Sequence, residues 1–498
     1  MADIKSAQAL LDDLPKNDPH KAVMELTEWI ESVSNNTDFK PDHQFSVLRL
    51  LDETAQPYAR KLAREYFAPQ GLNKFHENRL WLVLGNLFSH IAKAYYTLFH
   101  RYGKGEINMA GIKAQAPLLA TRAVCAMIGQ LKYSCARYGP IDKTIWDNIA
   151  KIYHQAEQQQ YLDTPINPYP LFPGNTTIKR EIGHLLGWYG CGVDTLSPLY
   201  MHLTERLINH YHTDIEVTRQ RDDGSLFSFN LNKPGTPMRI HVDTTLDPFT
   251  RFIGMAEMRP KLDALIKTLQ KNVVPDNLNL GGTYDADPVR EAAQFLLNYL
   301  TEPPLRRSLR RSIKVNLNIT NGFAKVIECT DVGLNFNHEH PVLWEISDIS
   351  LSGFFTVLPP TQGAEAPRIG SLLGIQPDGV SHWGVAVVRR MMRDETNCLH
   401  VGVEILANQM VGVALTQSCA GSDEFEDGQP ALWLHAKQGA PSAGETNLLM
   451  KADTFSPHRS LQVQLEGKNY LLIPNGLREK GVDFDLAKFR VIQQDQDS

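Results

Sequence analysis

The residues best suited to binding chemistry lie between Arg306 and Gly353. Four arginines form the cluster RRSLRR, at Arg306, Arg307, Arg310 and Arg311. The later motif DISLSG adds a carboxylate, a hydroxyl and a glycine, at Asp348, Ser350 and Gly353. A guanidinium fork can grip a phosphate, read the O6 and N7 edge of guanine or stack on a base, while an aspartate can accept the guanine N–H donors. Together these residue types predict a ligand that carries phosphates and guanine edges.

The sequence around these residues predicts β-strands. Directly after Arg311, the run SIKVNLNIT alternates apolar and polar residues, so that Ile313, Val315, Leu317 and Ile319 share one face of a half-buried strand. The motif DISLSG ends a second such run, where a serine can donate or accept a hydrogen bond and a glycine lets the backbone turn or approach a ligand. Further short β-prone runs follow at spacings typical of a small barrel, which we place at residues 313–410.

The β pattern continues beyond this barrel, through residues 411–498. Runs such as ALWLHAK, TNLLMK and RSLQVQL are interrupted by the loop-like segments PSAG and DEFEDG. The β half of the chain is therefore longer than one small barrel needs. It predicts an additional C-terminal β unit, either as a second barrel or as a sheet added to the first.

Residues 1–300 are dominated by helical periodicity and predict a mainly helical domain. Val23, Leu26 and Ile30 share one helix face, and the segment from His76 to Gly103 is apolar on more than one face, as expected for a central helix of a bundle. The exception is EVTRQRDDGSLFSFNL followed by MRIHV, which predicts a small β-hairpin insert near residues 215–243. Helical patterning then resumes around Pro248.

The adjacent prolines Pro303 and Pro304 cannot continue a helix, so residues 301–312 predict a linker that carries the arginine cluster. The expected fold class is multidomain α plus β. An N-terminal all-α helical domain is followed by an antiparallel β-barrel and by further C-terminal β structure.

The order of these motifs resembles the PilZ domain, the bacterial receptor module for cyclic di-GMP. The matching pieces are Arg307-x-x-x-Arg311, then Asp348-x-Ser350-x-x-Gly353, then the strand VGVEI at residues 401–405, so that the resemblance covers about residues 305–410. It implies a PilZ-like antiparallel β-barrel that holds cyclic di-GMP between the arginines and the Asp-Ser-Gly motif. The pair Arg306 and Arg310 has the same spacing as Arg307 and Arg311, so two arginine registers remain open.

Other candidate sites have simpler interpretations. The pairs His210/His212 and His338/His340 have the H-x-H spacing of metal ligands, but no third ligand accompanies either pair, so we expect no metal. GGTYDAD, from Gly281, matches no phosphate-binding loop and is interpreted as an ordinary loop. Arg389 and Arg390 lie on a predicted strand, and one of them is a secondary candidate for ligand contact. No catalytic signature is present, so we expect a non-enzymatic protein without a cofactor.

Composition limits the possible partners. A net charge of -6 argues against a surface that binds nucleic acid throughout, so any anion site must be local. The six cysteines are scattered, the first residues lack the features of a secretory signal, and no apolar run is long enough for a membrane span. These features predict reduced thiols and a cytoplasmic protein.

Two hypotheses follow from the sequence. The first is a non-enzymatic bacterial cyclic di-GMP receptor that binds the dinucleotide through its PilZ-like domain and transmits binding to a helical domain with an unidentified protein partner. The alternative is a PilZ-like scaffold or adaptor that has lost ligand binding and acts through protein–protein interaction alone.

Overall fold

A computed structural model describes the chain in twelve stretches. These are residues 4–36, 38–69, 71–105, 110–172, 174–241, 247–302, 311–330, 341–350, 352–360, 367–416, 428–435 and 444–494. The chain divides into two compact units, Met1–Pro304 and Leu305–Ser498. The first is mainly helical and the second contains antiparallel β-sheets, which confirms the predicted fold class.

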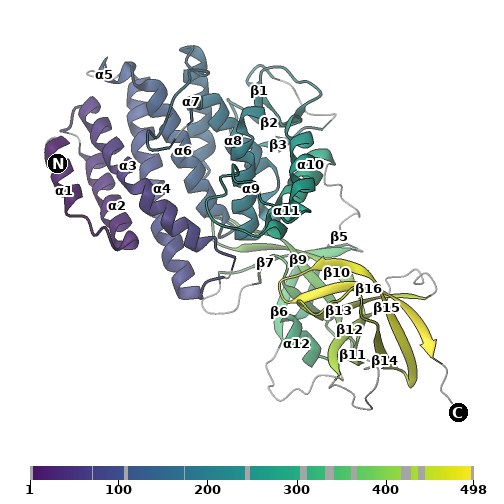
Figure 1. Cartoon of the computed structure of the whole chain (residues 1–498). Helices are drawn as coiled ribbons and strands as arrows, with labels where there is room; N and C mark the ends of the chain where they lie inside the picture. The colour runs from purple at the N-terminus through teal and green to yellow at the C-terminus, as the bar shows by residue number, and fades with distance from the viewer. Residues whose placement is uncertain are drawn as a thin grey trace. The chain divides into compact units, whose positions relative to one another are not determined.

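The N-terminal unit is built from helices that lie side by side (Figure 1). They are α1 (Ile4–Asp12), α2 (Pro19–Asn35), α3 (Pro41–Tyr66), α4 (Lys74–Gly103), α5 (Ala110–Lys113), α6 (Ala116–Cys135), α7 (Thr144–Gln158), α8 (Ile178–Gly190), α9 (Pro198–His210), α10 (Met258–Leu269) and α11 (Ala286–Thr301), with 3-10 turns at Val193–Thr195 and His212–Asp214. Side chains cap several helix starts: Asp18, Asn73 and Thr177 accept hydrogen bonds from first-turn amides of α2, α4 and α8.

The centre of this unit is the contact between α4 and α6. The apolar surface of α4 extends around more than one face, and the helix ends at Gly103, as its sequence predicts. Gly129 on α6 brings the two helices together, because a Cβ atom there would lie only 2.3 Å from Cδ1 of Phe88. An uninterrupted apolar cluster runs from this contact through all the long helices.

A small sheet packs beside α8 (Figure 1). Its strands are β1 (Glu216–Thr218), β2 (Ser225–Asn230), β3 (Met238–Arg239) and β4 (Thr250–Gly254), in the antiparallel order β1-β4-β2-β3. The hairpin expected near residues 215–243 is thus part of a larger sheet, because β4 inserts between β1 and β2. The helix predicted from Pro248 onward is wrong at β4. Four of the five residues of β4 are buried, so its sequence does not show the alternation of apolar and polar residues that indicates a strand.

A buried polar network joins α3, α4 and α6. The Arg122 guanidinium lies 3.3 Å from Asp52 Oδ2, donates to Tyr95 Oη at 3.1 Å and also pairs with Glu53. The Tyr95 hydroxyl and Gln56 Nε2 donate to the same Asp52 carboxylate at 2.8 and 2.7 Å. The side chains of Arg122 and Asp52 are 0% and 1% exposed, so each charge depends on the other for its stabilisation.

The C-terminal unit contains two closed six-stranded barrels. The first has the order β10-β7-β6-β5-β8-β9 and is formed by β5 (Arg311–Asn321), β6 (Val342–Ser350), β7 (Gly353–Leu358), β8 (Leu372–Pro377), β9 (Gly384–Arg393) and β10 (Leu399–Ala407). The second has the order β11-β12-β13-β16-β15-β14 and is formed by β11 (Met410–Thr416), β12 (Gln429–Leu434), β13 (Glu445–Lys451), β14 (Leu461–Leu465), β15 (Lys468–Lys480) and β16 (Phe484–Gln494). Of the two arrangements that the sequence left open, the structure has the second barrel.

A short helix connects the cores of the two barrels. This helix, α12 (Phe323–Glu328), follows β5 and buries Phe323, Val326 and Ile327 in a cluster with Val385 of the first barrel and Phe484 of the second. The backbone N–H of Phe323 also donates to Asp483 Oδ2 at 2.5 Å. The sequence interpretation missed α12, although its three apolar residues have the i, i+3, i+4 spacing of a helix face.

The first strand departs from its predicted alternation at one end. Leu317 and Ile319 are buried and Val315 is half-buried, but Ile313 is 44% exposed. A β-bulge interrupts the pairing with β6 between Ser312 and Val315, and β8 covers β5 only from Leu317 onward. The start of β5 therefore projects beyond the packed part of the barrel.

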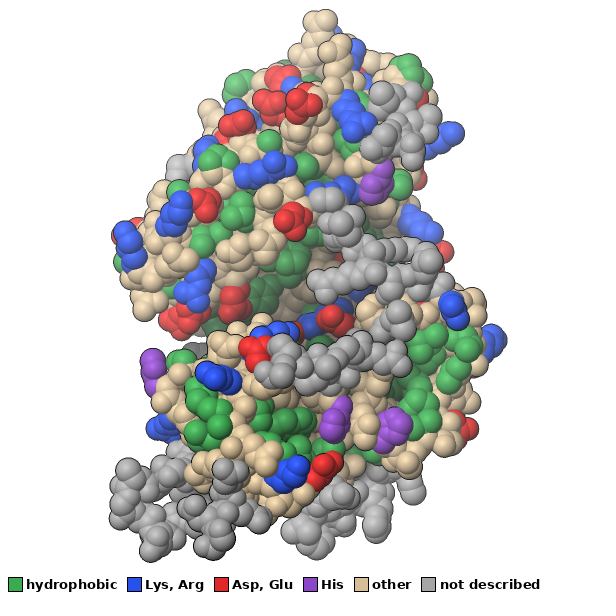
Figure 2. Space-filling model, turned by 90° about the vertical axis from the view of Figure 1, so that its right-hand side faces the viewer, with side chains coloured by type: hydrophobic (Ala, Val, Ile, Leu, Met, Phe, Trp, Pro, Cys, Tyr) green, Lys and Arg blue, Asp and Glu red, His purple; other side chains and the backbone are tan. Residues whose placement is uncertain are grey.

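Charges of both signs are interspersed on the surface shown in Figure 2. No single-sign field covers the described part of that face, in keeping with the modest net charge of -6. An anion site on this chain therefore has to be built from a local group of residues.

Removing the Arg122 guanidinium tests how strongly the helical unit depends on its buried network. Arg122→Ala leaves Asp52 buried without a cationic partner, and we expect the free energy of unfolding to fall by about 3–5 kcal/mol. Urea unfolding of the full chain, followed by the helical circular dichroism signal, measures this change, because that signal comes mainly from the N-terminal unit.

Arg49→Ala is the matched control, since Arg49 pairs with the same Glu53 at 3.6 Å but is 32% exposed. Its loss should cost no more than about 1 kcal/mol. Equal effects of the two substitutions would contradict the structural role assigned to Arg122.

Candidate ligand-binding site

The motif DISLSG lies at the reversal between β6 and β7 of the first barrel. Ser350, the last residue of β6, pairs with Gly353, the first residue of β7. The Ser350 hydroxyl donates to the carbonyl oxygen of Gly353 at 3.0 Å and so closes the reversal. The serine of the motif thus has a structural contact within the barrel.

Gly353 is required by the neighbouring strand β10. A Cβ atom at this position would lie 2.1 Å from the carbonyl oxygen of Val403, a contact that no side chain can make. The register pairs Gly353 with Glu404 and Phe354 with Val403, so the missing side chain lets β7 and β10 approach closely. The motif needs glycine here for strand packing.

Strand register aligns several of the candidate residues in one row across the outer face of the barrel. Asp348 on β6 pairs with Ser312 on one side and with Phe355 on the other. Phe355 pairs with Gly402 on β10, and Gly402 pairs with Arg390 on β9. Directly paired residues of antiparallel strands face the same way. A carboxylate, an aromatic ring, a glycine and a guanidinium therefore follow one another across four neighbouring strands.

The row faces outward at Phe355 and at Arg390, while Asp348 is half-buried and follows an irregularity in the pairing of β6 with β7. Phe354 and Thr356 are buried, whereas Phe355 between them is half-buried and Arg390 is exposed. The Phe355 ring contacts the ring of His400, with centroids 5.6 Å apart, and His400 Nε2 lies 2.8 Å from Asp394 Oδ2. This support from one side leaves Phe355 as a partly exposed aromatic platform beside Asp348.

The arginine cluster is only partly covered by the structure. Arg311 is the first residue of β5, is exposed, and pairs with Ile349 next to Asp348. The register thus brings Arg311 to the strand end that carries Asp348 and Ser350. Arg306, Arg307 and Arg310 lie outside the described residues, so both arginine registers stay predictions.

Arg389, a secondary candidate for ligand contact, takes part in ion pairs within the protein. Its Nε lies 2.8 Å from Glu404 Oε2, and its two terminal nitrogens donate to the Glu479 carboxylate at 2.5 and 2.7 Å. Glu404 belongs to β10 of the first barrel and Glu479 to β15 of the second. Arg389 therefore links the two barrels through its bidentate contact with Glu479. Its other partner, Glu404, pairs with Gly353 in the strand register.

Phe355, Gly402 and Arg390 are the residues of this candidate site that sequence reasoning missed or ranked low. The signal for Phe355 is present in GFFTVL, because alternation along a strand places Phe355 opposite to its neighbours Phe354 and Thr356. Gly402 and Arg390 join it only through the cross-strand register, which the sequence does not reveal.

Metal binding, disulfide formation and membrane insertion are three further properties that the described residues allow us to assess. Within the described stretches, His, Cys, Asp and Glu residues form no group of three that would hold a metal ion. Five of the six cysteines lie in the described part of the chain, and all five are free thiols. None of the described helices is long and apolar enough to cross a membrane.

Comparison with known families gives one match, to the helical unit. Residues 5–222 match the family described as the N-terminal domain of the cyclic-di-GMP receptor FimW. The match extends from α1 to the residues just after β1 and ends well before the first barrel. The chain has no match among curated proteins and none among solved structures. The match supports a family of cyclic di-GMP receptors.

Gly353→Ala tests whether this glycine serves strand packing. The added methyl group would meet the Val403 carbonyl oxygen, and we expect a loss of about 1–3 kcal/mol in the local stability of β7 and β10. Hydrogen exchange of the full chain should show faster exchange of amides in residues 353–358 and 399–407. Gly235→Ala is the control, because a Cβ atom there meets nothing within 4 Å. Unchanged exchange in Gly353→Ala would show that the clash is relieved elsewhere.

Proposed function

We propose that this chain is a non-enzymatic cyclic di-GMP receptor whose binding site lies on the first barrel, around the start of β5 and the β6–β7 reversal. The observation that carries the proposal is the agreement of two separate parts of the chain. Residues 5–222 match a family described as a cyclic-di-GMP receptor. The arginine and Asp-Ser-Gly motifs, which resemble PilZ, begin more than eighty residues later, at Arg306.

The outer row of the first barrel supports this proposal chemically. Arg311 and the arginines before it supply planar forks for the two phosphates, and Asp348 accepts hydrogen bonds from the guanine N–H edge. Phe355 offers a ring on which a guanine can stack, and Gly402 leaves open surface between that ring and the Arg390 guanidinium. A second base would stack on that guanidinium.

One observation favours the alternative, an adaptor that has lost ligand binding. Ser350 and Gly353 each have a contact that the barrel itself requires, so both would be retained even without a ligand. Their presence therefore argues less for binding than the sequence suggested. Asp348 and the arginines carry the distinction between the receptor and the adaptor.

Calorimetric titration of the full chain tests the proposed ligand. We expect binding of cyclic di-GMP with a Kd of about 1 μM or lower, equivalent to roughly 8 kcal/mol, and weaker binding of cyclic di-AMP and GTP. Arg307→Ala and Arg311→Ala should each weaken binding at least about tenfold, because a charge-assisted hydrogen bond contributes roughly 1.5–3 kcal/mol. Asp348→Ala should weaken binding and relax the preference for guanine.

Lys314→Ala is the matched control for these substitutions. It removes a cation from the same strand, and the Lys314 side chain is 87% exposed and pairs with Glu345 on the surface. Its affinity should be unchanged. A flat titration with folded wild-type protein would favour the adaptor, whereas damage from Arg306→Ala and Arg310→Ala instead would establish the other arginine register.

Transmission of binding is proposed to run through the junction between the two units. The arginines proposed to bind phosphate directly follow Pro303 and Pro304, so ligand binding would fix the junction at residues 303–312 and reset the helical domain, which would bind a protein partner. Hydrogen exchange should therefore show slower exchange across residues 303–312 with cyclic di-GMP, extending into α11. Slower exchange around Asp348 alone would contradict this route and direct attention to the Arg389 contact with Glu479 of the second barrel.

A further inference from the structure

The helical unit contains a cleft whose lining is unusually rich in basic side chains. It has a volume of about 250 Å³ and lies between α3, α6 and α9 and the loop that contains Asn279 and Gly281. Its basic lining residues are Arg60 and Arg64 from α3, Lys132 from α6 and Arg206 from α9. All of these elements belong to the helical unit, whereas the proposed cyclic di-GMP site is built from residues of the barrel unit.

No carboxylate of the described residues forms a close ion pair with the three arginines of the cleft. Among the described residues, neither Arg60 nor Arg64 has a carboxylate within ion-pair distance, and Arg206 reaches Glu205 only at 4.0 Å. Arg64 and Arg206 instead donate from Nε to the carbonyl oxygens of Gly281 and Asn279, at 3.2 and 2.8 Å. These bonds involve the Nε atoms of Arg64 and Arg206. They hold both side chains in place, but a neutral carbonyl group does not neutralise the charge of a guanidinium.

Arg60 shows the electrostatic cost of this arrangement. Its guanidinium carbon lies 3.1 Å from the centroid of the Phe172 ring, which supports one face of the group. Partial burial, together with the neighbouring charges of Arg206 and Arg64, lowers the pKa of Arg60 to about 10. Gathering like charges is unfavourable for folding, and a bound anion would offset this cost.

The acidic residues of the cleft are already engaged. Glu205 pairs with Lys132 at 2.5 Å and with His184 Nε2 at 3.1 Å. Burial alone would lower the pKa of His184, but the nearby carboxylates of Glu181 and Glu205 outweigh it and raise this pKa to about 9. His184 is therefore a cation at neutral pH, so both glutamates are balanced within the protein and the arginine charges remain in excess.

His202 adds an unused acceptor to the same cleft. Its side chain is stacked on Phe67, with centroids 4.3 Å apart, and its Nε2–H donates to the carbonyl oxygen of Leu280 at 2.8 Å. Burial lowers the pKa of His202 well below its ordinary value, so the ring is neutral and Nδ1 is an acceptor. His202 is only 4% exposed, and its Nδ1 is buried and has no hydrogen-bond partner among the described residues.

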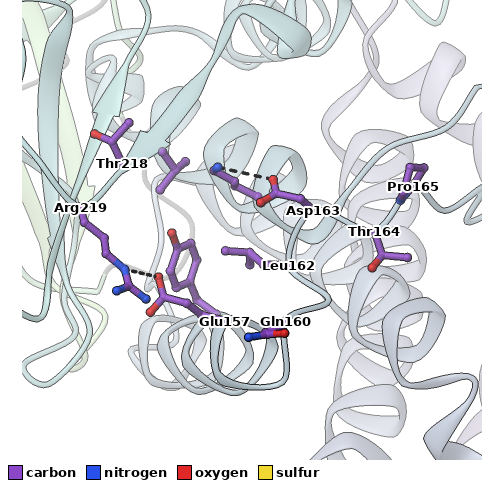
Figure 3. Close-up of a pocket in the computed structure, with 11 residues that line it drawn as sticks. Glu157, Gln160, Leu162, Asp163, Thr164, Pro165, Thr218 and Arg219 are labelled. Atoms are coloured by element: carbon purple, nitrogen blue, oxygen red, sulfur yellow. Dashed lines mark hydrogen bonds and ion pairs between the residues drawn. The ribbon is translucent and has the colours of Figure 1, made fainter.

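A larger cavity of the same unit differs from this cleft, because its basic side chains have close carboxylate partners. In the cavity drawn in Figure 3, Arg219 pairs with Glu157 at 3.0 Å and Lys179 pairs with Asp163 at 3.4 Å. Its basic side chains are thus neutralised by carboxylates of the same wall. The cleft of Arg60, Arg64 and Arg206 differs because its arginines lack such close partners in the described part of the chain, which is the property of an anion site.

We propose that the cleft bounded by Arg60, Arg64, Arg206 and Lys132 binds the phosphate group of a small phosphorylated molecule, as a second ligand site of this protein. Guanidinium groups on α3 and α9 present donors to several oxygens of one phosphate, a pattern that suits phosphate better than a carboxylate with its two oxygens. The acceptor Nδ1 of His202 suits a hydroxyl group carried by the same molecule.

Titration of the full chain with inorganic phosphate tests the site, with ionic strength held constant by sodium chloride. We expect saturable binding with a Kd of about 1 mM or lower. Arg60→Ala and Arg206→Ala should each weaken it at least tenfold. Lys61→Ala, which removes an exposed cation from the adjacent position of α3, should leave it unchanged. Equal losses in all three variants, or no saturable binding to the wild type, would overturn the proposal.

Two further measurements distinguish a phosphate site from arginines that only stabilise the fold. Because no described carboxylate pairs with Arg60, Arg60→Ala should melt at the same temperature as the wild type or higher, whereas loss of a structural arginine would lower the melting temperature. Cyclic di-GMP affinity of the same variant should be unchanged, and its loss would overturn the assignment of a separate site. Tighter binding of a nucleoside 5′-monophosphate or of a sugar phosphate than of inorganic phosphate would identify which group the phosphate is attached to.

Discussion

The close approach of β7 to β10 at Gly353 is the constraint on which the candidate site depends. The carbonyl oxygen of Val403 occupies the space that a side chain at position 353 would fill. This contact fixes the register of β7 against β10, and the Ser350–Gly353 reversal fixes β6 against β7. Because side chains of paired residues share a face, these two registers and the pairing of Gly402 on β10 with Arg390 on β9 bring Asp348, Phe355 and Arg390 into one row. A slip of one residue in either pairing would turn the aromatic ring into the core.

The arginines of this protein illustrate three ways of managing the same charge. Arg122 is fully buried and is held by Asp52 and Glu53, so it serves the fold of the helical unit. Arg389 is half-buried and is shared by Glu404 and Glu479, so it joins the two barrels. Arg60, by contrast, faces other cations and has an aromatic ring as its support. A positioned guanidinium without an anion is available to a ligand, whereas the first two already have their anions.

The sequence predicted the class of each half and the identity of most strands, because alternation and helical periodicity report burial directly. It predicted that Arg311 and Asp348 lie near one another, through the order of motifs. It did not reveal β4, whose residues are buried on both faces and so show no alternation. Nor did it reveal the outer row, since the partnership of Phe355, Gly402 and Arg390 depends on cross-strand register and on the bulges in β9 and β10. The cleft proposed to bind phosphate was not revealed for a related reason, because Arg206 is far along the chain from Arg60 and Arg64, and only the tertiary fold brings α9 and the loop at Gly281 to the same cleft as α3.

Photo-crosslinking of cyclic di-GMP to the full chain, with the crosslinked peptides identified by mass spectrometry, tests the central claim most directly. The helical unit matches a receptor family, while the residues proposed to bind the ligand lie in the other unit, so the location of the bound dinucleotide decides between the two units. We expect crosslinks in peptides of β5, β6 and β7, with Phe355 among the modified residues. Crosslinks confined to residues 1–304 would contradict a binding site on the first barrel.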